Sequence, residues 1–264
     1  MQLSDIIDCI EQIAPPAAQA SWDASGIQVA SRQETVNKLA VCLDPSPSSV
    51  GQALQQGAQC ILSHHPLALK PTLPRVLDNY HEVLRLLLCN GASLYAAHTS
   101  LDVNAEGPAG WLAAELGLQG LAVLEPVPGA PASETLPLGY GLVGDLPQKV
   151  AFPALLERLS PWVNLHLTHL SGPLPQTVGR IAYCTGSGSS LLAAARSAGA
   201  DIFITGDVKY HTALDSDIAL LDVGHHSLEE EMMRRMADLL HSRLPELEVV
   251  FVASASPMRP VILP

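Results

Sequence analysis

Two segments of the chain align with each other without a gap. One is VNKLAVCLDPSPSSVGQALQQGAQCILSHH, beginning at Val36, and the other is VGRIAYCTGSGSSLLAAARSAGADIFITGD, beginning at Val178. The matched positions are Val36 and Val178, Ala40 and Ala182, Cys42 and Cys184, Ser48 and Ser190, Ala53 and Ala195, Gly57 and Gly199, and Ala58 and Ala200. Alanine-rich βαβ units share composition for physical reasons, so chance similarity is the alternative explanation. If the copies are related, the chain folds as two similar halves.

Each copy predicts the same order of strand, helix and strand. An apolar strand leads into a turn rich in Ser, Pro and Gly and then into an alanine-rich helix that ends at Gly57 or Gly199, where a left-handed residue is favoured. The second strands, QCILS and DIFIT, are too apolar to face water on either side. We therefore predict an α/β fold with two related α/β domains, each a mixed sheet flanked by helices, in a pseudo-two-fold arrangement with a metal site in the cleft between them.

The best candidate for a linker is LEPVPGAPASETLPLGYG, which begins at Leu124. This segment is dense in Pro and Gly and poor in charge, as connecting segments are. It predicts a first domain at residues 1–125, carrying SHHP and HTSLD, and a second at residues 126–264, carrying TGDVKYH and GHHSLE.

Two further segments end an apolar strand with a histidine and place a carboxylate four residues later. They are LYAAHTSLD, ending at Asp102, and LLDVGHHSLE, ending at Glu229, and a helical pattern follows each. The spacing pairs His98 with Asp102 and His225 with Glu229. Because the second motif is doubled, His226 and Glu230 have the same spacing and stay open as the alternative pair.

The segment ILSHHPL at residues 61–67 ends a strand with two adjacent histidines. Open α/β sheets bind ligands at the carboxyl ends of strands. A single histidine there is often structural, but two adjacent ones reach one site only if the backbone bends or the site holds more than one ion. With the carboxylates, the candidate metal ligands are His64, His65, Asp102, His225 and Glu229. This mixture suits two divalent ions of Zn, Fe, Mn, Ni or Co rather than Mg or Ca.

Charge and cysteine content argue against several classes of protein. Lys and Arg total 14 against 26 Asp and Glu, a net charge of −12, so a basic face for nucleic acid is not expected. The five cysteines are widely spread and never form CxxC, which argues against a disulfide framework or a zinc ribbon. The N-terminus MQLSDIIDCIEQ is acidic where a signal peptide is basic and then apolar, and no apolar run is long enough for a membrane span. We expect a cytoplasmic protein.

The motifs SHHP, HTSLD, TGDVKYH and GHHSLEE, together with WDASGIQV and CTGSGSSL, resemble those of the NIF-three-like family. These are dinuclear metal-centre proteins that are often labelled GTP cyclohydrolase I type 2 homologues. The motifs occur in the family's order over nearly the whole chain, and the length resembles the short form without an inserted ferredoxin-like domain. The chain departs from the family pattern at VNAEGPAGW, where Trp111 stands close to an expected Asn, and at Ala24 and Ser25 of WDASG.

The resemblance implies a toroidal homohexamer with a metal pair facing an internal cavity. It assigns the ligands to the histidines of SHHP, the aspartate of HTSLD, and His225 and Glu229 of GHHSLE. It also implies that His98 transfers protons or supports the ligands, and that His211 of VKYH is a further catalytic histidine.

Two functions stay open at this point. The first is a metal-dependent hydrolase acting on a nucleotide or another small heterocyclic substrate, and the cyclohydrolase label would place its attack at C8 of GTP. The second is a non-catalytic hexameric scaffold that delivers metal or binds a protein partner. Motif resemblance assigns the site and not the chemistry.

Overall fold

The computed structural model describes residues 1–129 and 135–261. The chain forms two compact units. The first unit comprises Met1–Leu101 and Met233–Ser254, and the second comprises Asp102–Met232 and Ala255–Pro264. The chain therefore passes between units within α4 (Thr99–Asp102), within α9 (His225–Arg243) and after Ser254.

The first unit contains a five-stranded sheet. Its order is β1-β4-β3-β2-β11, and all neighbours are parallel except β1, which is antiparallel to β4. The strands are β1 (Gly26–Val29), β2 (Lys38–Cys42), β3 (Cys60–Ser63), β4 (Ser93–Ala96) and β11 (Glu248–Phe251). The helices are α1 (Leu3–Ile13), η1 (Pro16–Ala18), α2 (Pro47–Gln55) and α3 (Asn79–Asn90).

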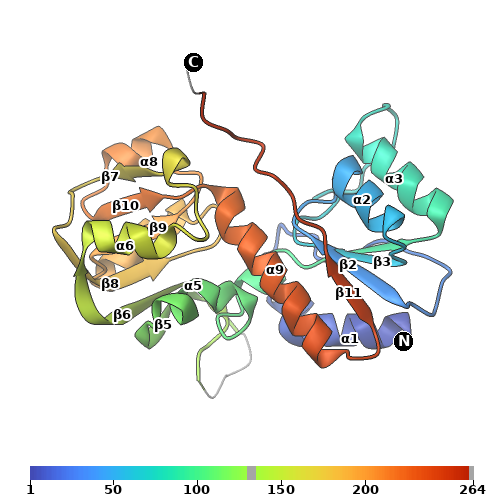
Figure 1. Cartoon of the computed structure of the whole chain (residues 1–264), viewed down its shortest axis with the longest axis horizontal. Coiled ribbons are helices and arrows are strands. Elements are labelled where there is room, and N and C mark those ends of the chain that lie inside the picture. Colours follow the sequence, from blue (N-terminus) through green and yellow to red (C-terminus); the bar gives the residue numbers. More distant parts are fainter. Residues whose placement is uncertain (130–134, 262–264) are drawn as a thin grey trace. The chain divides into compact units, whose positions relative to one another are not determined.

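Helices cover both faces of this sheet. Figure 1 shows α2 and α3 on one side of it and α1 on the other. On the first side, Ala40 and Ile61 belong to the same apolar core as Leu87 of α3. On the other side, the Tyr95 hydroxyl donates a hydrogen bond to Glu11 of α1 at 2.9 Å. The strands β3 and β4 are buried along their whole length, as their apolar sequences predict.

The second unit contains a six-stranded sheet of order β5-β6-β8-β9-β10-β7. The pairs β8·β9 and β9·β10 are parallel, and the other pairs are antiparallel. The strands are β5 (Gln119–Pro126), β6 (Gly139–Ala151), β7 (His169–Ser171), β8 (Thr177–Tyr183), β9 (Ile202–Thr205) and β10 (Ala219–Asp222). Besides α9, its helices are η2 (Pro108–Gly110), α5 (Trp111–Leu116), α6 (Phe152–Leu159), η3 (Leu165–Leu167), η4 (Ser189–Leu191), α7 (Leu192–Ser197) and α8 (Tyr210–Leu214).

The two predicted βαβ copies are confirmed. The first is β2, α2 and β3, and the second is β8, α7 and β9. Gly57 (φ +83°) and Gly199 (φ +75°) follow the helices in the left-handed conformation. In each sheet a third strand lies parallel to the second, β4 beside β3 and β10 beside β9. An antiparallel edge strand then lies beside it, β1 next to β4 and β7 next to β10. The strand ends that carry the candidate residues are therefore neighbours within each sheet.

The chain divides at a different place from the predicted boundary at residue 125. The segment that begins at Leu124 joins β5 to β6, which pair antiparallel in the second unit. Residues 130–134 of this segment lie outside the described residues. Its Pro and Gly residues predicted a linker because connections inside a sheet have the same composition as connections between domains.

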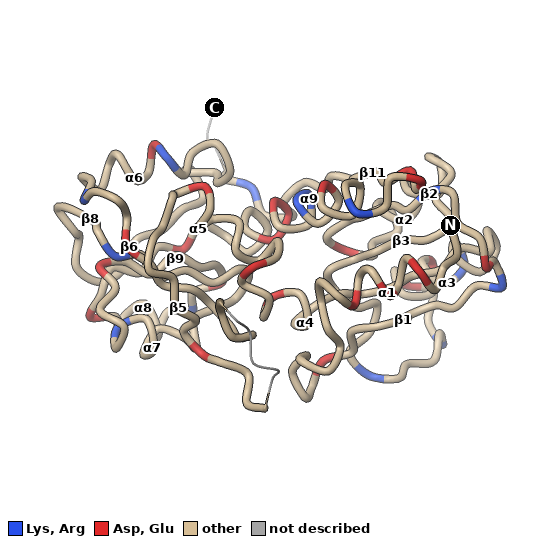
Figure 2. The backbone as a smooth tube through the Cα atoms, turned by 90° about the horizontal axis from the view of Figure 1, so that it is seen from below, with Lys and Arg blue, Asp and Glu red and all other residues tan. Residues whose placement is uncertain are grey.

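Acidic residues outnumber basic ones along the chain. Figure 2 shows Lys and Arg scattered among more numerous Asp and Glu in both units. No helix of the described chain is both long and apolar enough to span a membrane. The five cysteines are free thiols.

Two adjacent leucines of α3 test the packing of the first unit. Leu87 is fully buried in the core beneath α3, whereas Leu88 is 65% exposed. We expect Leu87→Ala to lower the free energy of unfolding by about 2–5 kcal/mol, because it leaves a cavity. We expect Leu88→Ala to change it by less than about 0.5 kcal/mol. Urea denaturation followed by circular dichroism measures both, and equal losses would contradict this packing of α3.

Candidate metal centre

Three histidines gather at the ends of β3 and β4 in the first unit. His64 and His65 follow β3 directly, and His98 follows β4 after Ala97. His64 is fully buried, and the other two are half-buried. One nitrogen from each imidazole lies within 4.8 Å of the other two, so these three side chains can hold a metal ion. The backbone therefore does bring the adjacent pair to one place, as the sequence required.

The Nδ1 atoms of these histidines are held by acceptors. His64 Nδ1 donates to the Ala97 carbonyl at 2.8 Å, and His65 Nδ1 donates to Asp44 Oδ1 at 2.7 Å. A carbonyl or an ionised carboxylate can only accept, so the proton of the neutral imidazole is on Nδ1. The Nε2 lone pair is therefore the one that is offered to an ion, which is the usual arrangement of metal-binding histidines.

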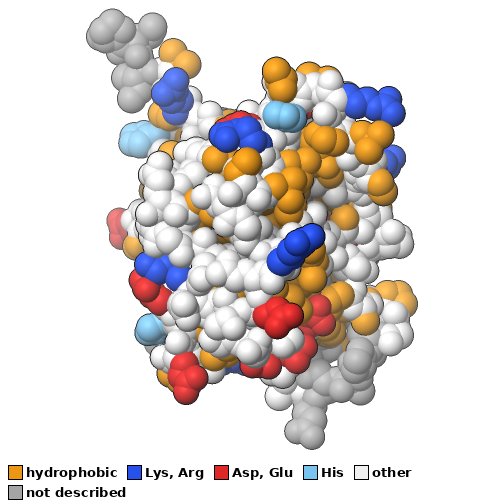
Figure 3. Space-filling model, turned by 90° about the vertical axis from the view of Figure 1, so that its right-hand side faces the viewer, with side chains coloured by type: hydrophobic (Ala, Val, Ile, Leu, Met, Phe, Trp, Pro, Cys, Tyr) orange, Lys and Arg blue, Asp and Glu red, His pale blue; other side chains and the backbone are white. Residues whose placement is uncertain are grey.

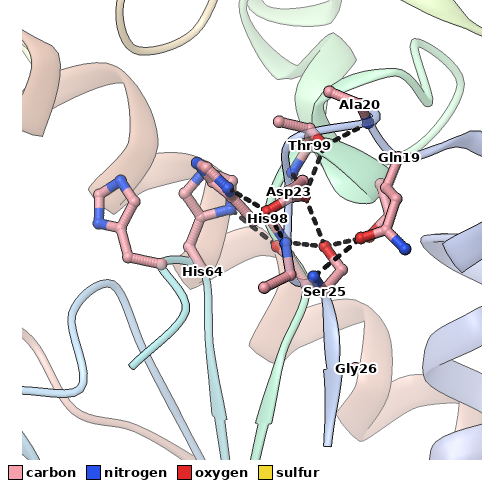
Figure 4. A network of polar contacts seen from close by, with 12 residues as sticks. Gln19, Ala20, Asp23, Ser25, Gly26, His64, His98 and Thr99 are labelled. Carbon is pink, nitrogen blue, oxygen red and sulfur yellow. Dashed lines mark hydrogen bonds and ion pairs between the residues drawn. The ribbon is translucent and has the colours of Figure 1, made fainter. Parts of the chain in front are cut away.

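Asp23 holds the third histidine through a dense set of hydrogen bonds (Figure 4). His98 Nδ1 donates to Asp23 Oδ1 at 2.8 Å. The same carboxylate accepts from Ala24 N at 2.7 Å, Ser25 Oγ at 2.9 Å and Thr99 N at 3.0 Å, and also from the Thr99 hydroxyl. Burial opposes ionisation of Asp23, but the hydrogen bonds from His98 and Thr99 outweigh it and hold its pKa well below the usual range.

In the second unit, His225 lies between two carboxylates at the start of α9. Its Nδ1 donates to Asp207 Oδ2 at 2.7 Å, and its Nε2 lies 2.7 Å from Glu229 Oε2. Burial lowers the pKa of His225, but Glu229 and Asp207 outweigh it and raise that pKa to about 9. The site therefore stabilises a positive charge at this position.

The loop that carries Asp207 is fixed by a further aspartate. Asp222, at the end of β10, accepts from Val208 N at 3.0 Å and from Gly224 N at 2.9 Å. One carboxylate therefore ties the loop after β9 to the loop that precedes His225. Asp207 has φ of 55°, a conformation uncommon outside glycine, which these contacts help to maintain.

Two glycines make room for the His225 and Glu229 pair. A Cβ atom on Gly186 would lie 2.0 Å from Glu229 Oε1, and one on Gly206 would lie 2.4 Å from the backbone nitrogen of His225. Gly186 also has φ of +57°, which favours glycine. These positions belong to the CTGSGSS and TGD motifs, which follow β8 and β9.

Asp102 lies in the same part of the second unit. Its Oδ1 accepts a hydrogen bond from the Thr185 hydroxyl at 3.1 Å. Burial raises the pKa of Cys184, and the negative charges of Asp102 and Glu229 raise it further, so both carboxylates lie near this one thiol. Together with His225, they give the second unit one nitrogen and two carboxylates as candidate ligands.

The alternative pair, His226 and Glu230, has a longer separation and different surroundings. Nε2 of His226 is 3.8 Å from Glu230 Oε2, against 2.7 Å for His225 and Glu229. His226 and Glu230 line a pocket of about 320 Å³ together with Trp162, Glu231 and residues of the C-terminal segment. The shorter separation and the contact with Asp207 favour His225 and Glu229 as the ligand pair.

The structure places the other predicted residues on different elements. His211 is an exposed residue of α8, with its ring centroid 5.4 Å from that of Tyr210. Its catalytic role stays a prediction. Trp111, the departure from the family pattern, is buried, and its indole nitrogen donates to the Leu228 carbonyl at the start of α9 at 3.1 Å. Trp111 therefore supports the helix turn that carries Glu229.

Sequence reasoning did not assign a role to Asp23, Asp44 or Asp207. All three stand in quoted segments, WDASG, VCLDPS and TGDVKYH, but their partners are 75, 21 and 18 residues away in the chain. For Asp44 and Asp207 a signal was present, because each stands in the turn just after a strand, in a fold that places histidines at neighbouring strand ends. Asp23 precedes β1 and carried no such signal.

The donor set fits a divalent transition metal. Neutral imidazole Nε2 atoms and carboxylates are ligands for Zn, Fe, Mn, Ni or Co, and the Nδ1 atoms are held by acceptors as such sites require. Buried His, Asp and Glu groups of this chain can therefore hold a metal ion.

The chain resembles known proteins over nearly its whole length. It matches the family model described as Duf34/NIF3 (NGG1p interacting factor 3) over residues 1–257. It is 32% identical over 249 residues to the GTP cyclohydrolase 1 type 2 homolog of Lactococcus lactis, covering 92% of both chains. The homolog of Clostridium perfringens is 29% identical over 258 residues, with 96% of both chains covered. The crystal structure of Staphylococcus aureus protein SA1388 has a TM-score of 0.86 at 23% identity over 99% of both chains, which shows the same fold.

Gly186→Ala tests the close approach of Glu229. The added Cβ would collide with the carboxylate, whereas at Gly199, with a similar φ of +75°, nothing lies within 4 Å of the added atom. We expect Gly199→Ala to lower the free energy of unfolding by about 1 kcal/mol through backbone strain alone. Gly186→Ala should cost about 1–3 kcal/mol more, because Glu229 must move. Chemical denaturation measures the difference, and equal losses would show that Glu229 does not lie against Gly186.

Proposed function

Because the chain belongs to the Duf34/NIF3 family, we propose that it binds two divalent transition-metal ions and hydrolyses a nucleotide or another small heterocyclic compound. The candidate ions are Zn, Fe, Mn, Ni and Co. The proposed ligands are His64, His65, Asp102, His225 and Glu229, and His98 is proposed to act beside them.

The orientation of the histidines is the observation that carries this proposal. Each of four imidazoles donates its Nδ1 proton to an acceptor, at 2.7–2.8 Å. Such contacts fix the ring, and they are the usual partners of metal-binding histidines. A metal ion would bind these rings at Nε2, and at His225 it would take the place of the proton that now lies toward Glu229. A histidine that serves only to fill a core does not need this arrangement four times. The repeated hydrogen bonding of Nδ1 supports binding of cations at Nε2 of these histidines.

The carboxylates support a site for more than one ion. Asp102 and Glu229 are both near Cys184, and Glu229 is almost fully buried. A buried carboxylate is costly unless a cation or several hydrogen bonds balance its charge. His98 and Asp102 stand one helical turn apart in the chain, since α4 comprises Thr99–Asp102.

The proposed reaction is a hydrolysis in which His98 moves the proton. When bound, a pair of divalent ions supplies Lewis acidity toward water and toward a substrate oxygen. The chain's own part is to hold the ligands and to keep His98 in one tautomer. Because Asp23 accepts the Nδ1 proton, His98 Nε2 is free to accept a proton and to return it. The name GTP cyclohydrolase 1 type 2 homolog, borne by the relatives, makes GTP a candidate substrate of this chain.

The alternative function is a metal-binding scaffold without turnover. The proposed assembly is the same in both cases, a toroidal homohexamer. An exposed apolar segment between β3 and α3 supports self-association, and it includes Leu69, Leu73, Val76 and Leu77. Figure 3 shows one face of the molecule, on which hydrophobic side chains gather. Apolar patches of this kind mark interaction sites.

Metal content tests the proposed site. We expect about two transition-metal ions per chain, by plasma mass spectrometry, in protein purified without chelators or a His tag. The double variant His64→Ala, Glu229→Ala should lose them. His241→Ala is the matched control, because His241 is an exposed residue near the end of α9 and should leave the metal content unchanged. A native protein that neither retains nor rebinds metal under reducing conditions would contradict the proposal.

Asp102→Ala separates the hydrolase from the scaffold. If the protein is a hydrolase, this variant should lose at least about 100-fold in the rate of release of formate or phosphate from GTP and related nucleotides, while its mass in solution stays that of the native assembly. Light scattering and turnover are measured on the same samples. An unchanged rate would show that Asp102 is not needed for hydrolysis. Loss of the assembly together with the metal would favour a structural role for the metal.

A further inference from the structure

Trp22 is an exposed aromatic residue beside the histidine cluster of the first unit. Its side chain is 60% exposed. Its ring centroid lies 5.7 Å from that of His98, with the two planes at 73°. His98 in turn lies 5.1 Å from His64 and 5.5 Å from His65 between ring centroids. The indole is thus next to the ring of a histidine that belongs to the candidate metal centre.

The backbone around Trp22 is held firmly. Asp23 N donates to the Ala20 carbonyl at 2.9 Å, which closes a turn around Ser21 and Trp22. Ala20 N donates to the Thr99 hydroxyl at 2.9 Å. Figure 4 shows Ala20, Asp23 and Thr99 in one connected network with His98. These two hydrogen bonds fix the backbone at Ala20 and Asp23, which lie on either side of Trp22 in the chain.

The exposure of Trp22 is therefore a feature of the fold rather than of a loose loop. Indole is the largest side chain, and folding usually buries most of it. Here the turn fixes the backbone from which the exposed indole extends, and the network that does so also orients His98. A ligand that covers the indole would also be adjacent to His98.

We propose that Trp22 is the stacking surface for a planar nitrogen heterocycle, such as a purine base, that binds beside His98. This inference rests on the proposed function and names the part of the substrate that the chain recognises. Flat heterocycles stack on indole without any requirement for a particular hydrogen-bond pattern. Because His98 touches the indole ring, a base stacked there lies close to the group that moves the proton.

The charge of the chain favours recognition through the base rather than through phosphates. The net charge is −12, so the protein as a whole repels polyanions. A neutral aromatic surface is not affected by this repulsion. We therefore expect nucleosides to bind through stacking even without a phosphate group.

Guanosine, adenosine and ribose are the probes for this inference. Saturation-transfer NMR titrations should give saturable binding of both nucleosides, in metal-loaded and in chelated protein, and none of ribose. Trp22→Ala should raise the dissociation constant for guanosine by about tenfold, whereas Trp22→Phe, which keeps an aromatic face, should raise it by less than about threefold. Leu88→Ala removes another exposed apolar side chain and should leave binding unchanged.

The outcomes separate this inference from the proposed function. Equal guanosine binding by the native protein and Trp22→Ala would overturn the stacking role even if two metal ions are present. If the protein holds no metal but its nucleoside binding still depends on Trp22, the metal proposal is wrong and the stacking role of Trp22 is supported. If Trp22→Ala instead changes the mass of the assembly in light scattering, Trp22 is a subunit contact and the inference is wrong. Failure of both nucleosides to bind also overturns it.

Discussion

In each unit, the candidate metal-binding histidines depend on hydrogen bonds from their imidazole Nδ1 atoms to fixed acceptors. Four histidines share this contact, and the acceptor is a carboxylate for His65, His98 and His225 and a backbone carbonyl for His64. Without an acceptor, a histidine at a strand end can rotate and exchange its proton between two nitrogens. With it, the ring, the tautomer and the direction of Nε2 are set by the sheet. The parallel order β2-β3-β4 puts the acceptor and the histidine of such a pair on neighbouring strand ends, as with Asp44 and His65.

The two copies of the repeat use the same positions for different partners. In the ungapped alignment, His65 corresponds to Asp207, and Asp44 corresponds to Gly186. In the first unit, Asp44 in the turn after β2 accepts from His65 after β3. In the second unit, Asp207 in the turn after β9 is itself the acceptor, and it holds His225 after β10. The glycine at the position of Asp44 leaves the space that Glu229 occupies. One βαβ frame therefore presents either a histidine or its acceptor at the same place.

The sequence predicted much of the fold because its signals are local. Apolar strands, glycines after helices and histidines at strand ends follow from periodicity and turn chemistry, and these elements are confirmed. The acceptors Asp23 and Asp207 were not identified, because an aspartate in a turn is common and its partner here is 75 or 18 residues away. The division of the chain also differs from the prediction. Composition marked the loop between β5 and β6, whereas the units divide inside α4 and α9, where the helical pattern continues without a break.

The most direct test of the proposed metal ligands is an anomalous-diffraction experiment on crystals of the metal-loaded protein. We expect anomalous peaks about 2.0–2.1 Å from the Nε2 atoms of His64, His65 and His225, while their Nδ1 atoms keep Ala97, Asp44 and Asp207 as partners. Binding through Nδ1, or ions found only at other residues, would contradict this expectation. Either result would show that the fixed acceptors do not serve to present these histidines to a metal.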